Sequence, residues 1–488
     1  MKLYISIVAL MIITHLSFSQ VGTLDTAFDI GSGASSNVES IAIQPDGKII
    51  IAGSFTSYNG TSINRLARLH PDGSLDNSFN IGSGPSGIVY KVKVLPNGKI
   101  FIAGSISRYN DQDCDFIVKL NSDGSRDTSF TVVHNSNQSS PAYDFHVLPD
   151  GKVLLAGILN DFAESGTRTL VRLNADGSHD TTFNLGGAGF EANIAGVTPY
   201  IKTIDVQSDG KILVGGFFFR YNGVNSRYIA RIDQDGSLDT TFQNGNTTFS
   251  GPSNEITAIT VLDNDKILVG GENSSYNGDS VKNLMRLNAD GTLDNAFSVL
   301  DAYNNYAVGI SSPSQIAVAS NGNIVVVGSR TSINGNPAKS IVLYDANGSL
   351  NTDFNAGMGL GPNSKLETCA IQEDGKILIG GIFQFNMYDT TPTNRLARIN
   401  TGGILGVHEL DLTTDTSIIY PNPSDHTLFI SSKNSFIKYS IYSQIGQKIE
   451  SNRFMSSMKI PIDHLNTGIY YLELIGSDRS GFTKFIKK

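Results

Sequence analysis

A short motif that returns seven times constrains this chain more than any other feature. The motif is an Asx-Gly turn followed by an apolar run, first seen as Pro45-Asp46-Gly47-Lys48-Ile49. Its turn position recurs at residues 47, 98, 151, 210, 265, 322 and 375, so successive units are 51 to 59 residues apart. A period of this length is the signature of a repeat architecture, in which each unit packs against its neighbours.

Each unit carries three turn signals. In the first unit they are Asp46-Gly47, Tyr58-Asn59-Gly60 and Asp72-Gly73. Asx-Gly pairs suit tight turns because both residues tolerate positive φ. Three turns separate four short strands, which in this unit we expect at 39–44, 48–55, 65–70 and 74–79. Four antiparallel strands repeated seven times predict an all-β fold, a seven-bladed β-propeller.

The two ends of the repeat region predict a closed ring. Units one to six finish with an Asx-x-x-Phe segment, such as Asp76 to Phe79, but the seventh unit lacks it. The missing piece stands near the N-terminus, where Asp25 and Phe28 have the same spacing. We therefore expect residues 22–28 to pair with 395–400 and to place Asp25 opposite Arg398. An open stack is the alternative, but closure removes a sheet edge that would invite aggregation.

A charged pair recurs within the units. Arg68 and Asp76 are equidistant from the turn residue Asp72, so they should face each other across a hairpin. The pair returns in units two to five, and in unit six both members change together, to Leu343 and Asn351. Concerted loss is what a cross-strand ion pair predicts. We expect these pairs to be exposed, in which case each would stabilise the fold by only about 0–1 kcal/mol.

The N-terminus and the composition indicate export. Lys2, an apolar stretch over 3–16 and Ser17-Phe18-Ser19 form a secretory signal peptide over residues 1–19. A membrane anchor is the alternative, but the stretch is shorter than the roughly 20 residues that a span needs. No later segment is expected to cross a membrane as a helix. A net charge of −9 disfavours nucleic acid as a partner, because phosphate binding needs a basic surface.

The channel of the predicted propeller holds the candidate ligand site. Aligning the first strands of the units brings a mixed-charge cluster toward one side of the axis: Lys91, Lys93, Asp144, His146 and Asp205. A solvated, salt-bridged channel lining is the alternative interpretation of these residues. No catalytic constellation, metal-ligand spacing or phosphate-binding loop stands out.

Two loops are candidates for calcium. Residues 121–127 and 233–239 are similar to the calcium loops of other propellers, but the earlier Asp of those loops is missing. We therefore interpret both loops as hairpin turns and expect no cofactor. Calcium in one or two units is the alternative.

The repeats resemble the delta-60 repeat family over residues 22–404. The residues that carry the resemblance are the Asp-Gly-Lys-Ile run at 46–49, the Tyr-Asn-Gly turn at 58–60 and the segment 67–79. The resemblance implies a β-propeller and no settled activity or ligand. Unit three lacks the Tyr-Asn-Gly turn, and unit five has Asp265 in place of the turn glycine.

Residues 418–488 look like the type A C-terminal sorting domain of the type IX secretion system, a small Ig-like β-sandwich. The resemblance rests on these motif residues: Tyr420, Pro421, Asn422, Pro423, Gly446, Gly468, Tyr470, Lys487 and Lys488. It implies the type IX machinery as a partner, passage through the outer membrane, removal of the tail, and surface attachment or release. The polar segment 406–417 is the expected linker after a propeller over 20–405.

These features favour a secreted or cell-surface binding module, without enzymatic activity, that presents its surface to a glycan or a protein. The alternatives are a polysaccharide lyase or hydrolase working in the channel, and a purely structural surface protein. Propellers host all of these functions, so the fold does not decide between them.

Overall fold

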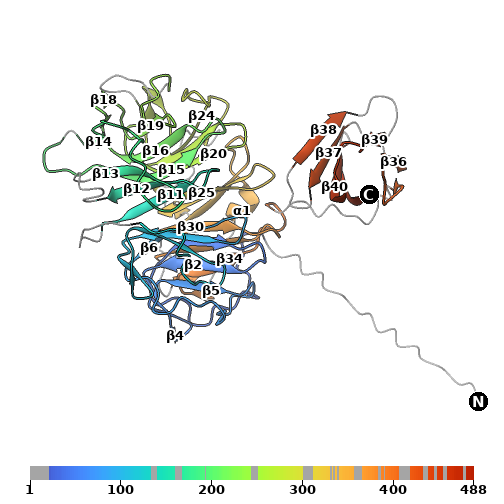
Figure 1. The fold of residues 1–488 in the computed structure, drawn as a ribbon, viewed down its shortest axis with the longest axis horizontal. Coiled ribbons are helices and arrows are strands. Elements are labelled where there is room, and N and C mark those ends of the chain that lie inside the picture. The colour runs from blue at the N-terminus through green and yellow to red at the C-terminus, as the bar shows by residue number, and fades with distance from the viewer. Residues whose placement is uncertain are drawn as a thin grey trace, which may run out of the picture. The chain divides into compact units, whose positions relative to one another are not determined.

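The structure is a computed structural model that divides into two compact units, one up to Gly406 and one from Val407 (Figure 1). It describes residues 21–132, 140–159, 168–192, 194–242, 251–299, 312–329, 332–333, 336–337, 340–356, 365–382, 386–388, 391–405, 418–431, 438–443, 448–453, 459–475 and 480–488. The predicted signal peptide and the linker at 406–417 lie outside these residues, and both remain predictions.

The first unit contains seven blades, each built on three antiparallel strands. In the blades whose three strands are all labelled in Figure 1, the first strand lies toward the middle and the third lies farther out. The blades, in chain order, are β1 (Val38–Ile43), β2 (Ile49–Gly53) and β5 (Leu66–Leu69); β6 (Val89–Val94), β7 (Ile100–Gly104) and β10 (Ile117–Leu120); β11 (Ala142–Val147), β12 (Val153–Leu159) and β13 (Arg168–Leu173); β15 (Tyr200–Val206), β16 (Ile212–Phe217) and β19 (Ile229–Ile232); β20 (Ile256–Val261), β21 (Ile267–Gly271) and β24 (Leu284–Leu287); β25 (Ser312–Val318), β26 (Ile324–Ser329) and β29 (Ile341–Tyr344); and β30 (Lys365–Ile371), β31 (Ile377–Ile382) and β34 (Leu396–Ile399).

The Tyr-Asn-Gly turns build small hairpins of their own on the edges of the blades. In blade 1 this hairpin is β3 (Ser57–Tyr58) with β4 (Thr61–Ser62), and Tyr58 donates a hydrogen bond to the Gly73 carbonyl at 2.7 Å. Equivalent hairpins are β8 (Arg108–Tyr109) with β9 (Gln112–Asp113), β17 (Arg220–Tyr221) with β18 (Val224–Asn225) and β14 (Phe190–Glu191), β22 (Ser275–Tyr276) with β23 (Asp279–Ser280), β27 (Ser332–Ile333) with β28 (Asn336–Pro337), and β32 (Asn386–Tyr388) with β33 (Thr391–Thr393).

The prediction that residues 74–79 form a fourth strand is wrong. In blade 1 this stretch forms one bridge, between Leu69 and Leu75, followed by a turn. The turn forms because the Asp76 carboxylate accepts the Ser78 amide at 2.9 Å and bends the chain away from the sheet. The same stretch of blade 6 ends in the short helix α1 (Thr352–Ala356).

The bend sends a buried phenylalanine onto the next blade. Phe79 lies against Gly124, where an added Cβ would stand 3.0 Å from the ring, and Gly124 has a φ of +90°. Both facts require glycine at this turn. Gly73, Gly291 and Gly348 lie against Phe28, Phe242 and Phe297 in the same way, so these turns are also packing surfaces for the neighbouring blade.

A buried set of contacts, here called the blade clamp, joins blades 1, 3, 4, 5 and 7 each to the next blade. In blade 1, Arg68 Nε lies 2.8 Å from Asp76 Oδ2 and Arg68 Nη1 donates to the Ser122 carbonyl of blade 2 at 2.6 Å. Lys48 Nζ lies 3.0 Å from the same Asp76 oxygen, and the guanidinium stands 4.7 Å from the centre of the Phe79 ring. Arginines in the same position are Arg172, Arg231, Arg286 and Arg398.

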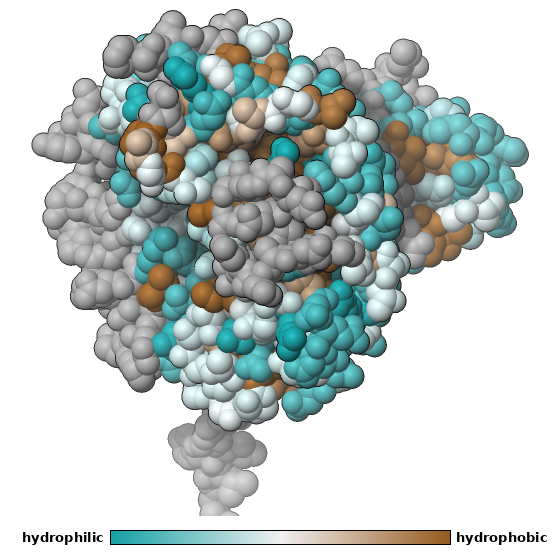
Figure 2. Space-filling view, turned by 60° about the vertical axis from the view of Figure 1, so that its left-hand side comes forward, coloured by the Kyte–Doolittle hydropathy of each residue, from teal (hydrophilic) through white to brown (hydrophobic). Residues whose placement is uncertain are grey.

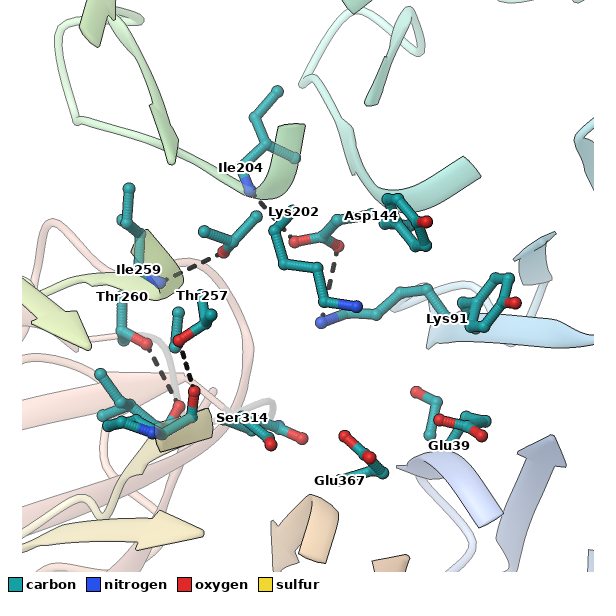
Figure 3. Close-up of a pocket in the computed structure, with 18 of the residues that line it drawn as sticks. Glu39, Lys91, Asp144, Lys202, Ile204, Thr257, Ile259, Thr260, Ser314 and Glu367 are labelled. Carbon is teal, nitrogen blue, oxygen red and sulfur yellow. Dashed lines mark hydrogen bonds and ion pairs between the residues drawn. The ribbon is translucent and has the colours of Figure 1, made fainter. Parts of the chain in front are cut away.

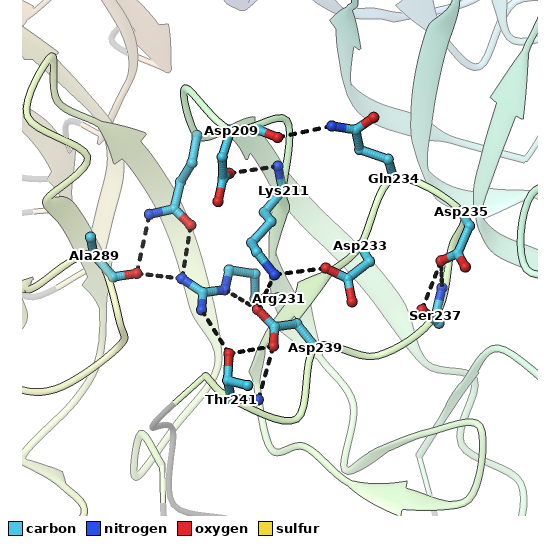
Figure 4. Close-up of polar contacts among 11 residues, drawn as sticks. Asp209, Lys211, Arg231, Asp233, Gln234, Asp235, Ser237, Asp239, Thr241 and Ala289 are labelled. Carbon is cyan, nitrogen blue, oxygen red and sulfur yellow. Dashed lines mark hydrogen bonds and ion pairs between the residues drawn. The ribbon is translucent and has the colours of Figure 1, made fainter.

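The expectation that these ion pairs are exposed is wrong. Arg68 is 6% exposed and Asp76 is 4% exposed, because the turn of the neighbouring blade covers them. Figure 4 shows the clamp of blade 4, where Arg231 contacts Asp239 and reaches the Ala289 carbonyl of blade 5. Lys211 lies 2.8 Å from the same Asp239 carboxylate. Breaking such a buried pair costs far more than losing an exposed one.

The N-terminal segment supplies the clamp of blade 7. Leu24 bridges Ile399, and Arg398 Nε lies 2.7 Å from Asp25 Oδ2. Arg398 Nη1 donates to the Pro71 carbonyl of blade 1 at 2.5 Å, and its guanidinium stands 4.7 Å from the Phe28 ring centre. The structure thus brings together the residues that the repeats place at the closure, in the geometry of the other clamps.

The second unit contains two antiparallel sheets. One holds β35 (Ile418–Tyr420), β36 (Thr427–Ser431) and β39 (Lys459–Pro461). The other holds β37 (Lys438–Ser443), β38 (Lys448–Arg453), β40 (Gly468–Ile475) and β41 (Ser480–Lys487). Their apolar residues, among them Leu428, Ile441 and Leu472, form one buried core. The Ig-like topology of this sandwich remains a prediction.

The closure predicts matched effects of paired substitutions. Phe28→Ala should lower the free energy of unfolding by about 3–5 kcal/mol, as expected for truncating a buried Phe. Asp25→Asn should cost about 1–3 kcal/mol, because it weakens the hydrogen bonds from Arg398 and Lys376. Phe79→Ala and Asp76→Asn in blade 1 are the controls, measured in the same urea titrations. Closure by this segment would be contradicted if Asp25→Asn and Phe28→Ala left the free energy of unfolding unchanged while Asp76→Asn and Phe79→Ala lowered it.

The clamps also predict loss of stability in acid. Burial alone would raise the pKa of Asp127, but hydrogen bonds from Ser129 and Lys99 outweigh it and lower the pKa to about 2. A carboxylate with a lowered pKa stabilises the fold above its unfolded pKa near 3.9, and this contribution disappears as the pH falls through the folded pKa. The free energy of unfolding should therefore fall between about pH 4 and pH 2.

The slope of that fall identifies its source. Asp127→Asn should make it shallower, whereas Asp279→Asn, at an exposed hairpin residue, should leave it unchanged. Equal slopes in wild type and Asp127→Asn, measured by urea denaturation at a series of pH values, would contradict the assignment.

Candidate functional site

A bulge in the first strand of every blade shapes the channel wall. In blade 1, Val38 pairs with Gly53 and Ser40 pairs with Ala52, so Glu39 is an extra residue with no partner of its own across the ladder. The same shift occurs in the first strands of the six other blades. A bulge re-aims side chains and bends its strand. It therefore adds a residue to the channel surface in each blade.

These seven extra residues, here called the bulge ring, line one cavity of about 240 Å³. They are Glu39, Tyr90, Tyr143, Lys202, Thr257, Ser314 and Glu367. Figure 3 shows Lys202 and Lys91 pointing into the cavity, Lys91 toward Asp144, with Glu39 and Glu367 on the facing wall. The cavity thus combines hydroxyls, amines, carboxylates and two aromatic rings.

Charge is unevenly distributed around the ring. Glu39 and Glu367 come from the neighbouring blades 1 and 7, whereas Lys202 comes from blade 4. Burial and the nearby Glu367 carboxylate raise the pKa of Glu39. Desolvation by the surrounding protein lowers the pKa of Lys202, although the negative charges of Glu367 and Glu39 act in the opposite direction. Lys365 Nζ lies 2.9 Å from Glu367 Oε1. The cavity can offer both donors and acceptors to a polar ligand.

The structure divides the predicted cluster into one ion pair and one histidine–carboxylate contact. Lys91 Nζ lies 3.5 Å from Asp144 Oδ1, and His146 Nδ1 lies 3.3 Å from Asp205 Oδ1. The ammonium of Lys93 stands 5.4 Å from the centre of the Phe145 ring, and burial lowers its pKa. Lys91, Lys93, Asp144 and Asp205 line the cavity.

The two aspartates of the cluster also hold blades together. Asp144 Oδ2 accepts the Ile204 amide of blade 4 at 3.1 Å, and Asp205 Oδ2 accepts the Val261 amide of blade 5 at 2.8 Å. Burial would raise the pKa of Asp205, but bonds from His146 and the Val261 amide lower it. Both carboxylates are therefore largely committed to the scaffold.

Asp144 belongs to a set of interblade bonds, here called the inner girdle. At five of the seven steps a side-chain oxygen accepts the backbone amide of the next blade, each at 3.1 Å. The acceptors are Ser40, Asp144, Thr203, Gln315 and Thr368. The Thr368 bond runs from blade 7 to Ile41 of blade 1, so the girdle spans the closure as well.

The predicted cluster makes up only part of the charge that lines the cavity. Glu39, Lys202, Lys365 and Glu367 also line the cavity, and simple strand alternation misses them. A signal for the bulge is present in the sequence. In Val38-Glu39-Ser40-Ile41 two polar residues follow each other between apolar ones, and other first strands repeat the pattern, as in Leu366-Glu367-Thr368-Cys369.

The two loops considered for calcium use their carboxylates locally. Asp123 Oδ1 accepts the Ser125 amide at 3.0 Å and its hydroxyl at 2.7 Å, and Asp235 bonds to Ser237 in the same way. Within the described parts of the chain, no group of three or more His, Cys, Asp or Glu side chains is placed to hold a metal ion.

The sorting-motif residues meet along the last strand of the second unit. Asn422 Nδ2 donates to the Lys484 carbonyl at 3.0 Å, and its Oδ1 accepts the Ile486 amide at 2.9 Å. Tyr470 stacks on Phe485 with ring centres 5.5 Å apart. Gly468 pairs with the buried Lys487 at the start of β40, and Gly446 lies outside the described residues.

The family comparisons decide what the repeats and the tail are. The family described as a domain of unknown function (DUF5122) beta-propeller matches seven times, over residues 44–79, 95–130, 148–183, 207–242, 263–297, 319–354 and 372–405. This chain belongs to that β-propeller family. Residues 418–488 match the secretion system C-terminal sorting domain, which indicates export by the type IX system to the cell surface or the medium. Both resemblances expected from the sequence are confirmed.

Solved structures of low sequence identity are similar to this DUF5122 chain. PorZ, described as an essential surface component of the type IX secretion system of Porphyromonas gingivalis, is 13% identical, with a TM-score of 0.38 over 92% of this chain and 70% of PorZ. The extracellular domain of BT4673 from B. thetaiotaomicron is 12% identical, with a TM-score of 0.46, and this chain spans 59% of it. None of these likenesses transfers a function. No curated protein sequence matches the chain.

No helix in the described residues is long and apolar enough to cross a membrane. The sorting domain lies within the second compact unit of the chain.

Deleting residues 418–488 should leave a folded propeller that accumulates in the periplasm, because the tail carries the sorting motif and shares no core with the blades. Fractionation of cells expressing the full and truncated chains, with immunoblotting, measures this. The tail fused to a different periplasmic protein is the control and should carry that protein out. Truncated protein at normal levels in the medium or on the cell surface would contradict the prediction.

Proposed function

We propose that this exported β-propeller is a non-enzymatic binding module that takes an uncharged glycan at the cavity lined by the bulge ring. The observation that carries the proposal is the makeup of this ring. All seven of its residues bring polar groups that are not among the inner-girdle acceptors, and two bring aromatic rings into the same cavity. Binding pockets characteristically pair apolar or aromatic surface with a few placed polar groups.

The chemistry of the ring favours a hydroxyl-rich ligand over an ionic one. Amines and carboxylates oppose each other across the cavity, with Lys202 facing Glu39 and Glu367 (Figure 3). A polymer whose charges all have one sign would be repelled by one of the two walls. Hydroxyl groups donate and accept, so they suit both walls.

The surface of the propeller supports the same choice. On the face shown in Figure 2, apolar residues form separate patches among polar ones. Exposed large apolar side chains of the described propeller residues are few, and the most exposed is Leu185 at 84%. Broad apolar contact, as in many obligate protein interfaces, has little support there.

A polysaccharide-cleaving enzyme is the second candidate, and one observation favours it. Glu39 and Glu367 are two carboxylates in one cavity, and the raised pKa of Glu39 is what a general acid needs. Structural charge networks perturb pKa values in the same way, so this observation alone ranks below the composition of the whole ring.

On a glycan array, the full chain should bind a subset of the neutral oligosaccharides. Lys202→Ala and Glu367→Gln should each weaken binding about tenfold or more, the loss expected for hydrogen bonds to a charged group. Lys282→Ala, at a half-exposed lysine of blade 5 outside the cavity, is the matched control and should leave binding unchanged.

Two results would overturn the proposal. One is the absence of any bound glycan, and the other is binding that Glu367→Gln leaves intact. Release of new reducing or unsaturated chain ends from a bound glycan, lost in Glu39→Gln, would replace the binding module by the enzyme.

A further inference from the structure

A continuous row of aromatic rings leads from the cavity across blade 4. Tyr143 of the bulge ring lies 5.3 Å from Tyr90 and 6.2 Å from Tyr200, measured between ring centres. Tyr200 stacks on Phe217 at 5.8 Å with an interplanar angle of 22°. Phe217 in turn lies 5.6 Å from Phe219. We name Tyr90, Tyr143, Tyr200, Phe217 and Phe219 the aromatic row, and all five are half-buried.

The other blades show that two of these rings are not needed for the fold. Phe217, the last residue of the second strand, and Phe219 flank the buried Phe218. Blade 1 has Ser54 and Thr56 at the same positions, on either side of the buried Phe55. Blade 2 has Ser105 and Ser107, and blade 5 has Glu272 and Ser274. The propeller therefore forms with small or polar residues at these places.

Cations lie at both ends of the outer half of the row. Lys202 Nζ stands 4.4 Å from the ring centre of Tyr143. Arg227 stands 5.4 Å from that of Phe219 and 4.9 Å from that of the buried Tyr228. Between them, the Tyr200–Phe217 pair presents stacked rings, and the Tyr200 hydroxyl bonds to Glu255. Donors and an acceptor thus border an aromatic platform.

We propose that the aromatic row is an extended subsite for a linear, uncharged glycan, whose sugar rings stack on Tyr200 and Phe217 while one end of the chain enters the cavity. This inference rests on the proposed function. The apolar C–H faces of a sugar ring complement the negative face of an aromatic ring. Lys202, Arg227 and Glu255 would bond to the hydroxyls at its edge. A row of this length selects chains over single sugars, since a monosaccharide covers only one or two rings.

The test replaces the blade 4 residues by those of blade 1. The exported chain and its Phe217→Ser/Phe219→Thr variant are titrated calorimetrically with soluble linear β-glucan, xylan and mannan oligosaccharides, and with glucose, xylose and mannose. The variant should bind the oligosaccharides about tenfold more weakly, and urea titration should show a folded protein. Leu185→Ser, at an exposed apolar residue in the connection between blades 3 and 4, is the control and should change nothing.

A second variant separates loss of the platform from loss of folding. The chain has no tryptophan. Phe217→Trp should keep oligosaccharide binding and give a fluorescence signal that shifts when the oligosaccharide is added. This readout reports contact at the platform itself and does not depend on the stability of the serine variant.

The outcomes separate the two proposals. If wild type binds oligosaccharides but the Phe217→Ser/Phe219→Thr variant binds them equally well, the extended subsite is wrong and the cavity site stands. Binding of acidic polymers alone, tested with alginate, or of peptides alone, would overturn the neutral-glycan assignment. If wild type binds no glycan, the proposed function fails, and the subsite fails with it.

Discussion

The propeller depends on one buried contact, the arginine that pairs with its own blade and bonds to the next. A blade of three strands cannot bury both of its faces alone, so its stability is a property of its interfaces. Arg231 shows how the interface is fixed, since its guanidinium holds Asp239 in blade 4 and the Ala289 carbonyl in blade 5. Phe242 lies beneath the same guanidinium, at 4.8 Å, and packs on the turn glycine Gly291. Charge, hydrogen bonding and apolar packing thus meet at one place in each of these blades.

Blade 6 shows that the ring tolerates loss of this contact where another can replace it. Leu343 and Asn351 stand where Arg and Asp stand elsewhere, and Leu343 joins the apolar core with Phe354. The Asn351 side chain accepts the Phe354 amide at 2.9 Å and so begins α1 in place of the usual turn. An apolar replacement of a buried ion pair is often neutral in stability, whereas removal of one partner is not. Both partners would therefore have to change together, which is the pattern that made the pair visible in the sequence.

Repeats made the clamp and its N-terminal partner predictable, because the position of a residue within the repeat assigns it a place without any knowledge of distances. Asp25 and Arg398 could be paired across 373 positions of sequence for this reason. The burial of the pair could not be predicted in the same way, since it comes from the neighbouring blade and not from the unit itself. The candidate site was predicted only in part. Lys91 and Asp144 line the cavity as expected, but Glu39, Lys202 and Glu367 were missed, because alternation was carried through a bulge that breaks it. The bulge is visible in the sequence as two adjacent polar residues, and in a repeat protein this pattern occurs several times.

The same repeats separate scaffold from site. A residue type that recurs in equivalent positions, such as Tyr58, Tyr109, Tyr221 and Tyr276, has the same hydrogen bond to a turn carbonyl in each blade and needs only a structural explanation. The bulge ring behaves differently. Its backbone geometry recurs, yet its side chains range from Glu39 through Tyr143 to Lys202. A ligand site in a symmetric scaffold requires this combination. The blades need the same backbone geometry in order to pack, whereas an asymmetric ligand needs different side chains around it. Blade 4 also departs in chemistry, with Phe217 and Phe219 where blades 1 and 2 have serine or threonine, and it departs on the side that adjoins the cavity through Tyr200 and Tyr143. Function in this propeller is therefore to be sought where the units disagree.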